Sequence, residues 1–118
     1  MKQVNRVDFG SVKIHKRVLA EIVISALSEV HGVQRLPKNF FIQAEEILGA
    51  KRYPGISVVV DKNNQVTVEV RILVEYGLNI LDAAKQVQDV IREAIERTVD
   101  IDLKDIHVNV QGLIKTAG

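Results

Sequence analysis

The sequence predicts an α+β fold of two layers, in which a mainly antiparallel or mixed sheet carries two long helices and one short helix on one face. Three observations lead to this prediction. Residues 66–76 alternate between apolar and polar types, whereas residues 80–98 and 15–30 repeat their apolar positions every three or four residues. Since strands and helices are interspersed without a linker, we expect a single domain over residues 1–118.

The first predicted elements are a short strand over residues 10–14 and a helix that begins near His15 and can end at Gly32. The polar side of this helix carries Ile24, with Ala20 and Leu27 beside it. An apolar patch on a water-facing helix side often marks a contact. We therefore expect either that Ala20, Ile24 and Leu27 mediate self-association or that residues 40–48 cover them.

The middle of the chain predicts a brief strand over residues 33–36, a short helix over residues 39–48, and a hairpin of residues 56–60 and 66–76. Asp and Asn side chains in the intervening DKNNQ stabilise such a turn. Alternation in the second hairpin strand places one set of side chains toward the core: Val66, Val68, Val70, Ile72, Val74 and Tyr76. The residues between them face water.

After Gly77 the apolar period changes from that of a strand to that of a helix. Asn79 is a suitable N-cap, and the carboxylate of Asp82 suits the positive helix end. We expect the helix to run to Thr98 and to fold back over the strand before it, with Ala84, Val87, Ile91, Ala94 and Ile95 inward. A last strand, DIHVNVQG, turns Ile106, Val108 and Val110 inward and His107, Asn109 and Gln111 outward.

The outward face of the predicted sheet is the candidate surface for a protein partner. It is broad and polar, with one large aliphatic side chain, Leu73. Because exposed substitutions rarely change stability by more than about 0.5 kcal/mol, we expect Arg71 and Leu73 to tolerate charge changes. The candidate partner-binding residues are Lys13, Glu69, Arg71, Leu73, Glu75, His107 and Asn109.

The residues needed for common enzyme chemistry do not occur in a recognisable pattern. The chain has no cysteine and three isolated histidines, and the cluster of Asp100, Asp102 and Asp105 does not follow the spacing of a calcium loop. Nucleotide-binding glycine loops and the serine nucleophile motif are missing as well. We therefore expect no catalytic residue, no metal site and no cofactor.

The net charge of +1 is too small for strong attraction to nucleic acid or anionic lipid. Residues 1–60 carry nine basic and five acidic side chains, or +4, and residues 61–118 carry seven and ten, or −3. Lys13, Lys16, Arg17, Lys51 and Arg52 are basic residues that a weak docking surface can use. No apolar run reaches the ~20 residues of a membrane span, so we expect a cytoplasmic protein without direct membrane insertion.

The order of segments resembles the bacterial alkaline shock protein family, also known as the general-stress or envelope-stress-response family. The resemblance runs from Gly10 to Leu113 through GSVKIHKRVLAEIVISALSEVHGV, GISVVV and VTVEVRILVEYGLNILDAAKQVQDVIREAIE to IHVNVQGL. Its most specific parts are VEYG, the following amphipathic helix with VQ, and the closing VNVQG. The middle segment LPKNFFIQAEEILGAKRYPG replaces what is often a glycine-rich stretch in this family.

This resemblance implies a non-enzymatic cytoplasmic adaptor or scaffold, linked to cell-envelope stress and brought to the inner face of the membrane by an anchored protein partner. Two alternatives remain: an RNA-binding α+β module, and a small-ligand carrier linked to lipid metabolism. RNA binding requires a basic stripe or a GXXG loop, which the sequence lacks. The carrier requires a deep apolar pocket under residues 40–48.

Overall fold

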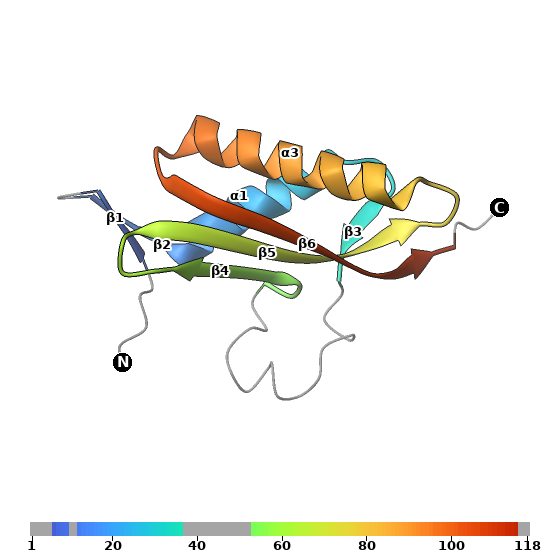
Figure 1. The fold of residues 1–118 in the computed structure, drawn as a ribbon, viewed down its shortest axis with the longest axis horizontal. Helices are drawn as coiled ribbons and strands as arrows, with labels where there is room; N and C mark the ends of the chain where they lie inside the picture. The colour runs from blue at the N-terminus through green and yellow to red at the C-terminus, as the bar shows by residue number, and fades with distance from the viewer. Residues whose placement is uncertain (1–5, 10–11, 37–52, 116–118) are drawn as a thin grey trace.

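The structure, a computed structural model, describes residues 6–9, 12–36 and 53–115. It confirms the α+β class (Figure 1). The short helix predicted over residues 39–48 lies outside the described residues. In chain order the elements are β1 (Arg6–Phe9), β2 (Val12–His15), α1 (Lys16–Leu27), β3 (Val33–Arg35), β4 (Ile56–Val60), β5 (Gln65–Glu75), α3 (Ile80–Thr98) and β6 (Asp102–Ile114).

Strand β5 is the centre of a mixed four-stranded sheet. On one edge it pairs with β6, in parallel and along its whole length. On the other edge it pairs antiparallel with β4 along its first half and with β3 along its second half. The parallel pair is possible because α3 carries the chain back to the end of the sheet at which β5 begins. The sheet is therefore three strands wide at every level.

Strands β3 and β4 act as one edge strand that is interrupted opposite Arg71. The Arg71 N–H donates to the Gly55 carbonyl (2.7 Å), and the Arg71 carbonyl accepts from the Leu36 N–H (3.0 Å). The main-chain N–H and carbonyl of one strand residue point to the same edge of the strand. Leu36 and Gly55 therefore lie side by side at this edge of β5. The chain leaves the sheet after Leu36 and rejoins it at Gly55.

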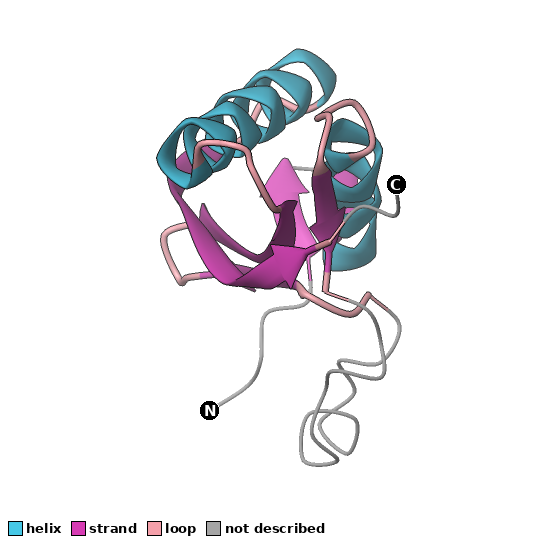
Figure 2. Ribbon diagram, turned by 90° about the vertical axis from the view of Figure 1, so that its right-hand side faces the viewer, coloured by secondary structure: helices cyan, strands magenta, loops and turns pink. Residues whose placement is uncertain are grey.

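The core lies between the sheet and the two helices, which Figure 2 shows on the same side of the curved sheet. All five inward residues predicted on β5 from Val66 to Val74 are fully buried. Helix α3 contributes Val87, Ile91, Ala94 and Ile95, as predicted, and Ala83 lies deeper than the predicted Ala84. The prediction for Tyr76 is wrong, because β5 ends at Glu75 and the Tyr76 side chain is 66% exposed in the turn that follows.

The N-terminal hairpin of β1 and β2 forms a separate two-stranded sheet. Strand β1 was not predicted from the sequence. Asn64, in the turn between β4 and β5, joins the hairpin to the main sheet: its Oδ1 accepts from the Asp8 N–H (3.1 Å) and its Nδ2 donates to the Asp8 carbonyl (2.8 Å). Asp61 stabilises the same turn by accepting from the N–H groups of Asn63 and Gln65, as expected for DKNNQ.

Both helices begin at a side-chain cap. Asn79 Oδ1 accepts from the Asp82 N–H (3.0 Å), which confirms the predicted N-cap of α3. Helix α1 uses a less common cap, because His15 Nδ1 accepts from the Arg17 N–H (3.1 Å). This bond requires an unprotonated Nδ1 and places the start of α1 directly after β2.

Leu73 is 8% exposed, so the expectation that it is a water-exposed aliphatic residue is wrong. It faces away from the helices, but it lies between its neighbours Gln34 on β3 and Gly112 on β6. A Cβ atom on Gly112 would lie 3.2 Å from Leu73 Cδ2, so the missing side chain at position 112 leaves room for Leu73. Because Leu73 is buried, we do not expect it to tolerate a charged substitution, contrary to the expectation from the sequence.

Gly55 and Gly77 form a matched pair for a test of the interrupted edge strand. Both have positive φ (84° and 103°), which costs an L-residue about 1–3 kcal/mol. A Cβ atom on Gly55 would also lie 3.0 Å from the Arg71 carbonyl oxygen and 3.1 Å from the Leu36 nitrogen, whereas Gly77 has open space. We predict that Gly55→Ala lowers the free energy of unfolding more than Gly77→Ala does. Equal losses in urea unfolding would show that Gly55 is not pressed against β5.

Leu73→Ala tests the burial of the outward side of β5. Truncation of a buried leucine removes its packing contacts, so we predict a loss of roughly 2–4 kcal/mol in the free energy of unfolding. The control is Val59→Ala on β4, whose side chain is 55% exposed and whose loss should stay within about 0.5 kcal/mol. A loss at Leu73 as small as at Val59 would contradict its buried position.

Candidate interaction surfaces

The first candidate surface is the side of β5 and β6 that faces away from the helices, which we call the open face. Glu69 and His107 are paired in register across the two strands, as are Arg71 and Asn109. The Glu69 carboxylate accepts from Asn109 Nδ2 (2.8 Å) and lies 3.5 Å from Arg71 Nη2. About one third of the Glu69 and Arg71 side chains remains exposed. The Glu69 carboxylate is thus fixed between the Arg71 guanidinium and the Asn109 amide.

The structure brings four of the predicted partner-binding residues into this arrangement and places Glu75 at the end of the same strand. Lys13 is separate from them, since it lies on β2 in the N-terminal hairpin and not in the four-stranded sheet. The prediction that Lys13 belongs to the same sheet face is therefore wrong. Leu73 lies among the open-face residues in sequence, but its burial leaves little of it for a partner to contact.

The expected exposed patch on α1 is absent. Ala20 is 5% and Leu27 is 4% exposed, and Ile24 is half-buried. These residues are buried because α1 packs against α3 as well as β3 and β4. Residues 40–48, the proposed alternative cover, lie outside the described residues.

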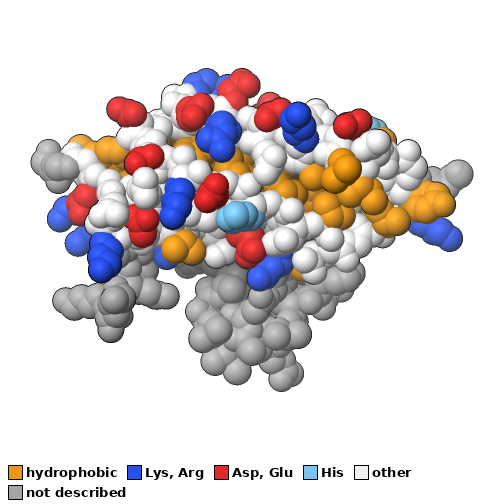
Figure 3. Space-filling model, viewed as in Figure 1, with side chains coloured by type: hydrophobic (Ala, Val, Ile, Leu, Met, Phe, Trp, Pro, Cys, Tyr) orange, Lys and Arg blue, Asp and Glu red, His pale blue; other side chains and the backbone are white. Residues whose placement is uncertain are grey.

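A second surface was not predicted. Five large apolar side chains are exposed where β5 turns into α3 and where β6 ends, and we call this the apolar end. Figure 3 shows hydrophobic side chains gathered over the start of α3 and the end of β6. Leu81 is the most exposed of them, at 81%. The apolar end consists of Tyr76, Leu78, Ile80, Leu81 and Leu113.

Main-chain hydrogen bonds hold the turn at the apolar end in place. The Tyr76 N–H donates to the Ile114 carbonyl (2.7 Å), and the Glu75 N–H donates to the Gly32 carbonyl (2.8 Å). The turn is therefore attached both to the end of β6 and to the loop after α1. The sequence did contain a signal for this surface: Leu81 shares a helix side with Lys85, four residues later, and so falls outside the inward stripe of α3.

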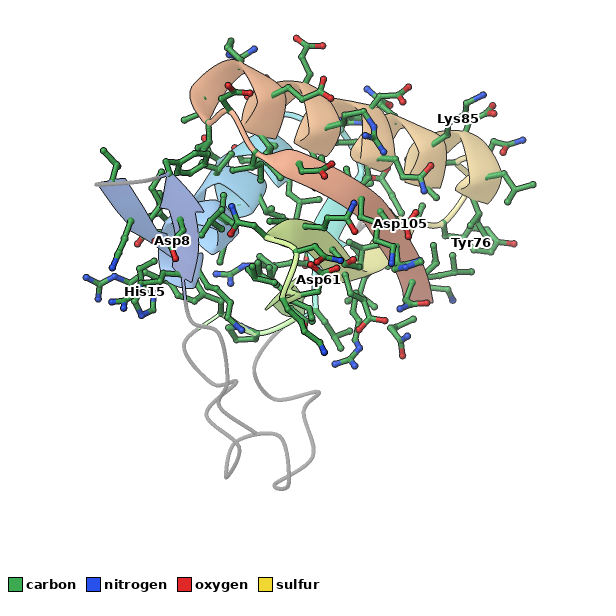
Figure 4. All side chains as sticks on the ribbon, turned by 60° about the vertical axis from the view of Figure 1, so that its left-hand side comes forward. Asp8, His15, Asp61, Tyr76, Lys85 and Asp105 are labelled. Carbon is green, nitrogen blue, oxygen red and sulfur yellow. The ribbon has the colours of Figure 1, made fainter. Side chains whose placement is uncertain are left out.

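The opposite end of the molecule is charged. Figure 4 shows Asp8 and His15 on the hairpin, far from Tyr76. Lys16 and Arg17 occupy the first turn of α1, where positive charge opposes the helix dipole. Partial burial also lowers the pKa of Lys16 below its usual value, because desolvation disfavours the ammonium form. Lys51 and Arg52, the other predicted basic residues, lie outside the described residues.

The described residues contain no group of three His, Cys, Asp or Glu side chains that could hold a metal ion. Asp100 lies between α3 and β6, whereas Asp102 begins β6 and Asp105 lies within it. Asp102 Oδ2 accepts from Gln65 Nε2 (3.1 Å). In the described part of the chain, neither helix is long and apolar enough to cross a bilayer.

The three most specific motifs of the family resemblance have structural roles. Gln88, of the VQ pair in α3, donates from Nε2 to the Ile106 carbonyl of β6 (3.0 Å), which ties the helix to the strand. In VNVQG, the pairing of β5 and β6 shifts between Val110 and Gly112, so Gln111 is an extra residue, and Gly112 then accommodates Leu73. VEYG spans the last two residues of β5 and the start of the turn at the apolar end.

Comparison with known proteins tests the family resemblance. Residues 4–115 match the model of the alkaline shock protein 23 family, described as having a cell envelope-related function. The uncharacterised protein YqhY of Bacillus subtilis is 30% identical over 105 residues, which cover 88% of this chain and 77% of YqhY. YloU, an uncharacterised protein of the same organism, is 23% identical over 110 residues, or 92% of each chain. No solved structure matches the chain.

The family model covers nearly the whole chain, including both helices and all the strands described above. The family is not a known enzyme family. The resemblance predicted from the order of segments is confirmed, and the chain belongs to the alkaline shock protein 23 family.

Proposed function

We propose that the protein is a non-enzymatic adaptor or scaffold that serves a cell envelope-related function by binding a protein partner through its open face. The observation that supports this most is the arrangement of Glu69 between Arg71 and Asn109 on a sheet face that the helices leave uncovered. These contacts fix the positions of polar groups before a partner arrives. Binding then costs less conformational entropy than it would with freely rotating side chains.

The two alternatives from the sequence have less support. An RNA-binding sheet needs a positive surface and stacked aromatic side chains. The open face instead carries the carboxylates of Glu69, Glu75 and Asp105 for its one arginine, and its described residues include no Phe, Tyr or Trp. The ligand-carrier alternative depends on residues 40–48, which lie outside the described residues.

The proposed location is the cytoplasm, with attachment to the inner face of the membrane through an anchored partner. The exposed side of α3 carries acidic and basic residues in balance, including the Glu93–Arg97 pair (3.4 Å). An interfacial helix needs a polar side rich in Lys and Arg, and its apolar side must be free to enter the lipid. The apolar side of α3 is buried against the sheet.

Arg71→Glu tests the open face. The substitution places a second carboxylate beside Glu69, so we expect at least a tenfold loss in capture of the partner from membrane and cytosol fractions, measured by quantitative mass spectrometry. The control is Arg92→Glu, the same charge reversal on the exposed side of α3. Circular dichroism should show both variants folded. Equal capture by Arg71→Glu, Arg92→Glu and the wild type would contradict a role for the open face.

Sedimentation with liposomes tests the location. We predict that the purified protein stays in the supernatant with anionic phosphatidylserine vesicles at physiological salt, although part of it fractionates with membranes in its native cell. Each Lys or Arg at the lipid surface can contribute ~1 kcal/mol, so Lys16 and Arg17 are the residues to reverse in a control. Sedimentation of the wild type that is lost in Lys16→Glu/Arg17→Glu would replace the anchored partner with direct electrostatic attachment.

A further inference from the structure

The apolar end collects most of the large apolar surface that the described residues expose. Eight large hydrophobic side chains are exposed in this part of the chain, and five of them belong to the apolar end. The other three, Val12, Val18 and Val59, lie on β2, α1 and β4. Scattered apolar residues need no explanation, whereas a continuous exposed patch on a soluble domain marks a contact site.

The free edge of β6 runs toward the apolar end. Its first part is better protected against the addition of another strand than its second part. Among the described residues β6 pairs only with β5, so its other side is an edge. The first part of this edge carries Asp102, Lys104 and Asp105, and Gln88 occupies the Ile106 carbonyl. Charges and covering side chains of this kind prevent strands from adding to an edge. Residues 108–114 contain no charged residue and end at Leu113 and Ile114.

The charges around the apolar end are balanced. Glu75 precedes Tyr76, Asp82 follows Leu81, Lys85 lies one turn further along α3, and Lys115 follows Ile114. Two acidic and two basic groups thus border one apolar surface. In a twofold interface a residue away from the axis meets a different residue of the other copy. A border of mixed sign can therefore pair with itself, whereas a border of one sign repels itself.

We propose that the apolar end and residues 108–114 of β6 form a twofold interface with a second copy of this chain. The uncharged halves of the two β6 edges lie along each other, the apolar ends pack together, and acidic border groups of one copy face basic groups of the other. An anionic lipid surface fits less well, because the border carries no net positive charge to attract it. This interface shares Asn109 and Glu75 with the open face, but the argument for it does not depend on the function proposed above.

Sedimentation velocity over a concentration series from low micromolar to near millimolar tests this interface. The wild type should shift from monomer to dimer as concentration rises. Leu81→Asp puts a charge on the most exposed residue of the apolar end, and we expect it to raise the dimer dissociation constant at least about tenfold. Val59→Asp is the matched control, because it places the same charge on another exposed apolar residue, on the far edge of the sheet.

The high exposure of Leu81 keeps the test independent of folding, and thermal unfolding of each variant at a concentration where the wild type is monomeric verifies this. A wild type that stays monomeric over the whole series would overturn the proposal. This holds even if the monomer binds a different protein or a vesicle through Leu81. Equal dimerisation of Leu81→Asp and the wild type would also overturn it. Weaker dimerisation of Leu81→Asp with unchanged Val59→Asp supports it.

Discussion

The structure depends on the hydrogen bonding of β5 along both of its edges. Parallel pairing with β6 satisfies one edge, and β3 and β4 together satisfy the other, with Arg71 bonded to both sides of the interruption. A strand paired in this way has no free edge, and its inward side chains from Val66 to Val74 are fully buried under the helices. Since an unpaired buried main-chain group costs about as much as a lost hydrogen bond, the rest of the fold is arranged around this strand.

Both candidate surfaces follow from this arrangement. The inward side of β5 is used by the core, so polar residues for a partner can only lie on its outward side, where Glu69, Arg71 and Asn109 contact one another. The parallel pairing requires α3 to begin at one end of the sheet and β6 to finish at that same end. The apolar side chains of the turn and of the end of β6 are thereby brought together, although they are more than thirty residues apart in sequence.

The sequence predicted the elements whose pattern repeats over many residues. The inward residues of β5, the capped start of α3 at Asn79 and the alternation of Ile106, Val108 and Val110 all follow from local periodicity. The period of a strand does not reveal its direction relative to a neighbour, so the parallel pairing of β6 could not be derived from it. Strand β1 has four residues, too few for a period to be recognised.

Surface assignments were less predictable, since exposure depends on what other elements cover. Alternation places Leu73 correctly on the outward side of β5 but does not show that Gln34 and Gly112 enclose it. In the same way, Ala20 and Leu27 were assigned to water because the contact of α1 with α3 is not visible in the sequence. Tyr76 continues the alternation of β5 in sequence only, because the chain leaves the sheet at Glu75.

The central claim, that β5 is continuously bonded on both edges despite the interruption between β3 and β4, is tested most directly by amide hydrogen exchange measured by NMR. The account predicts that the Arg71 N–H, bonded to the Gly55 carbonyl, exchanges as slowly as the N–H groups of Thr67 and Glu69, which point to the same edge of β5 and face β4. Exchange of Arg71 at the rate of an unprotected loop amide, with Thr67 and Glu69 still slow, would show that the edge opens at the interruption and would contradict the account.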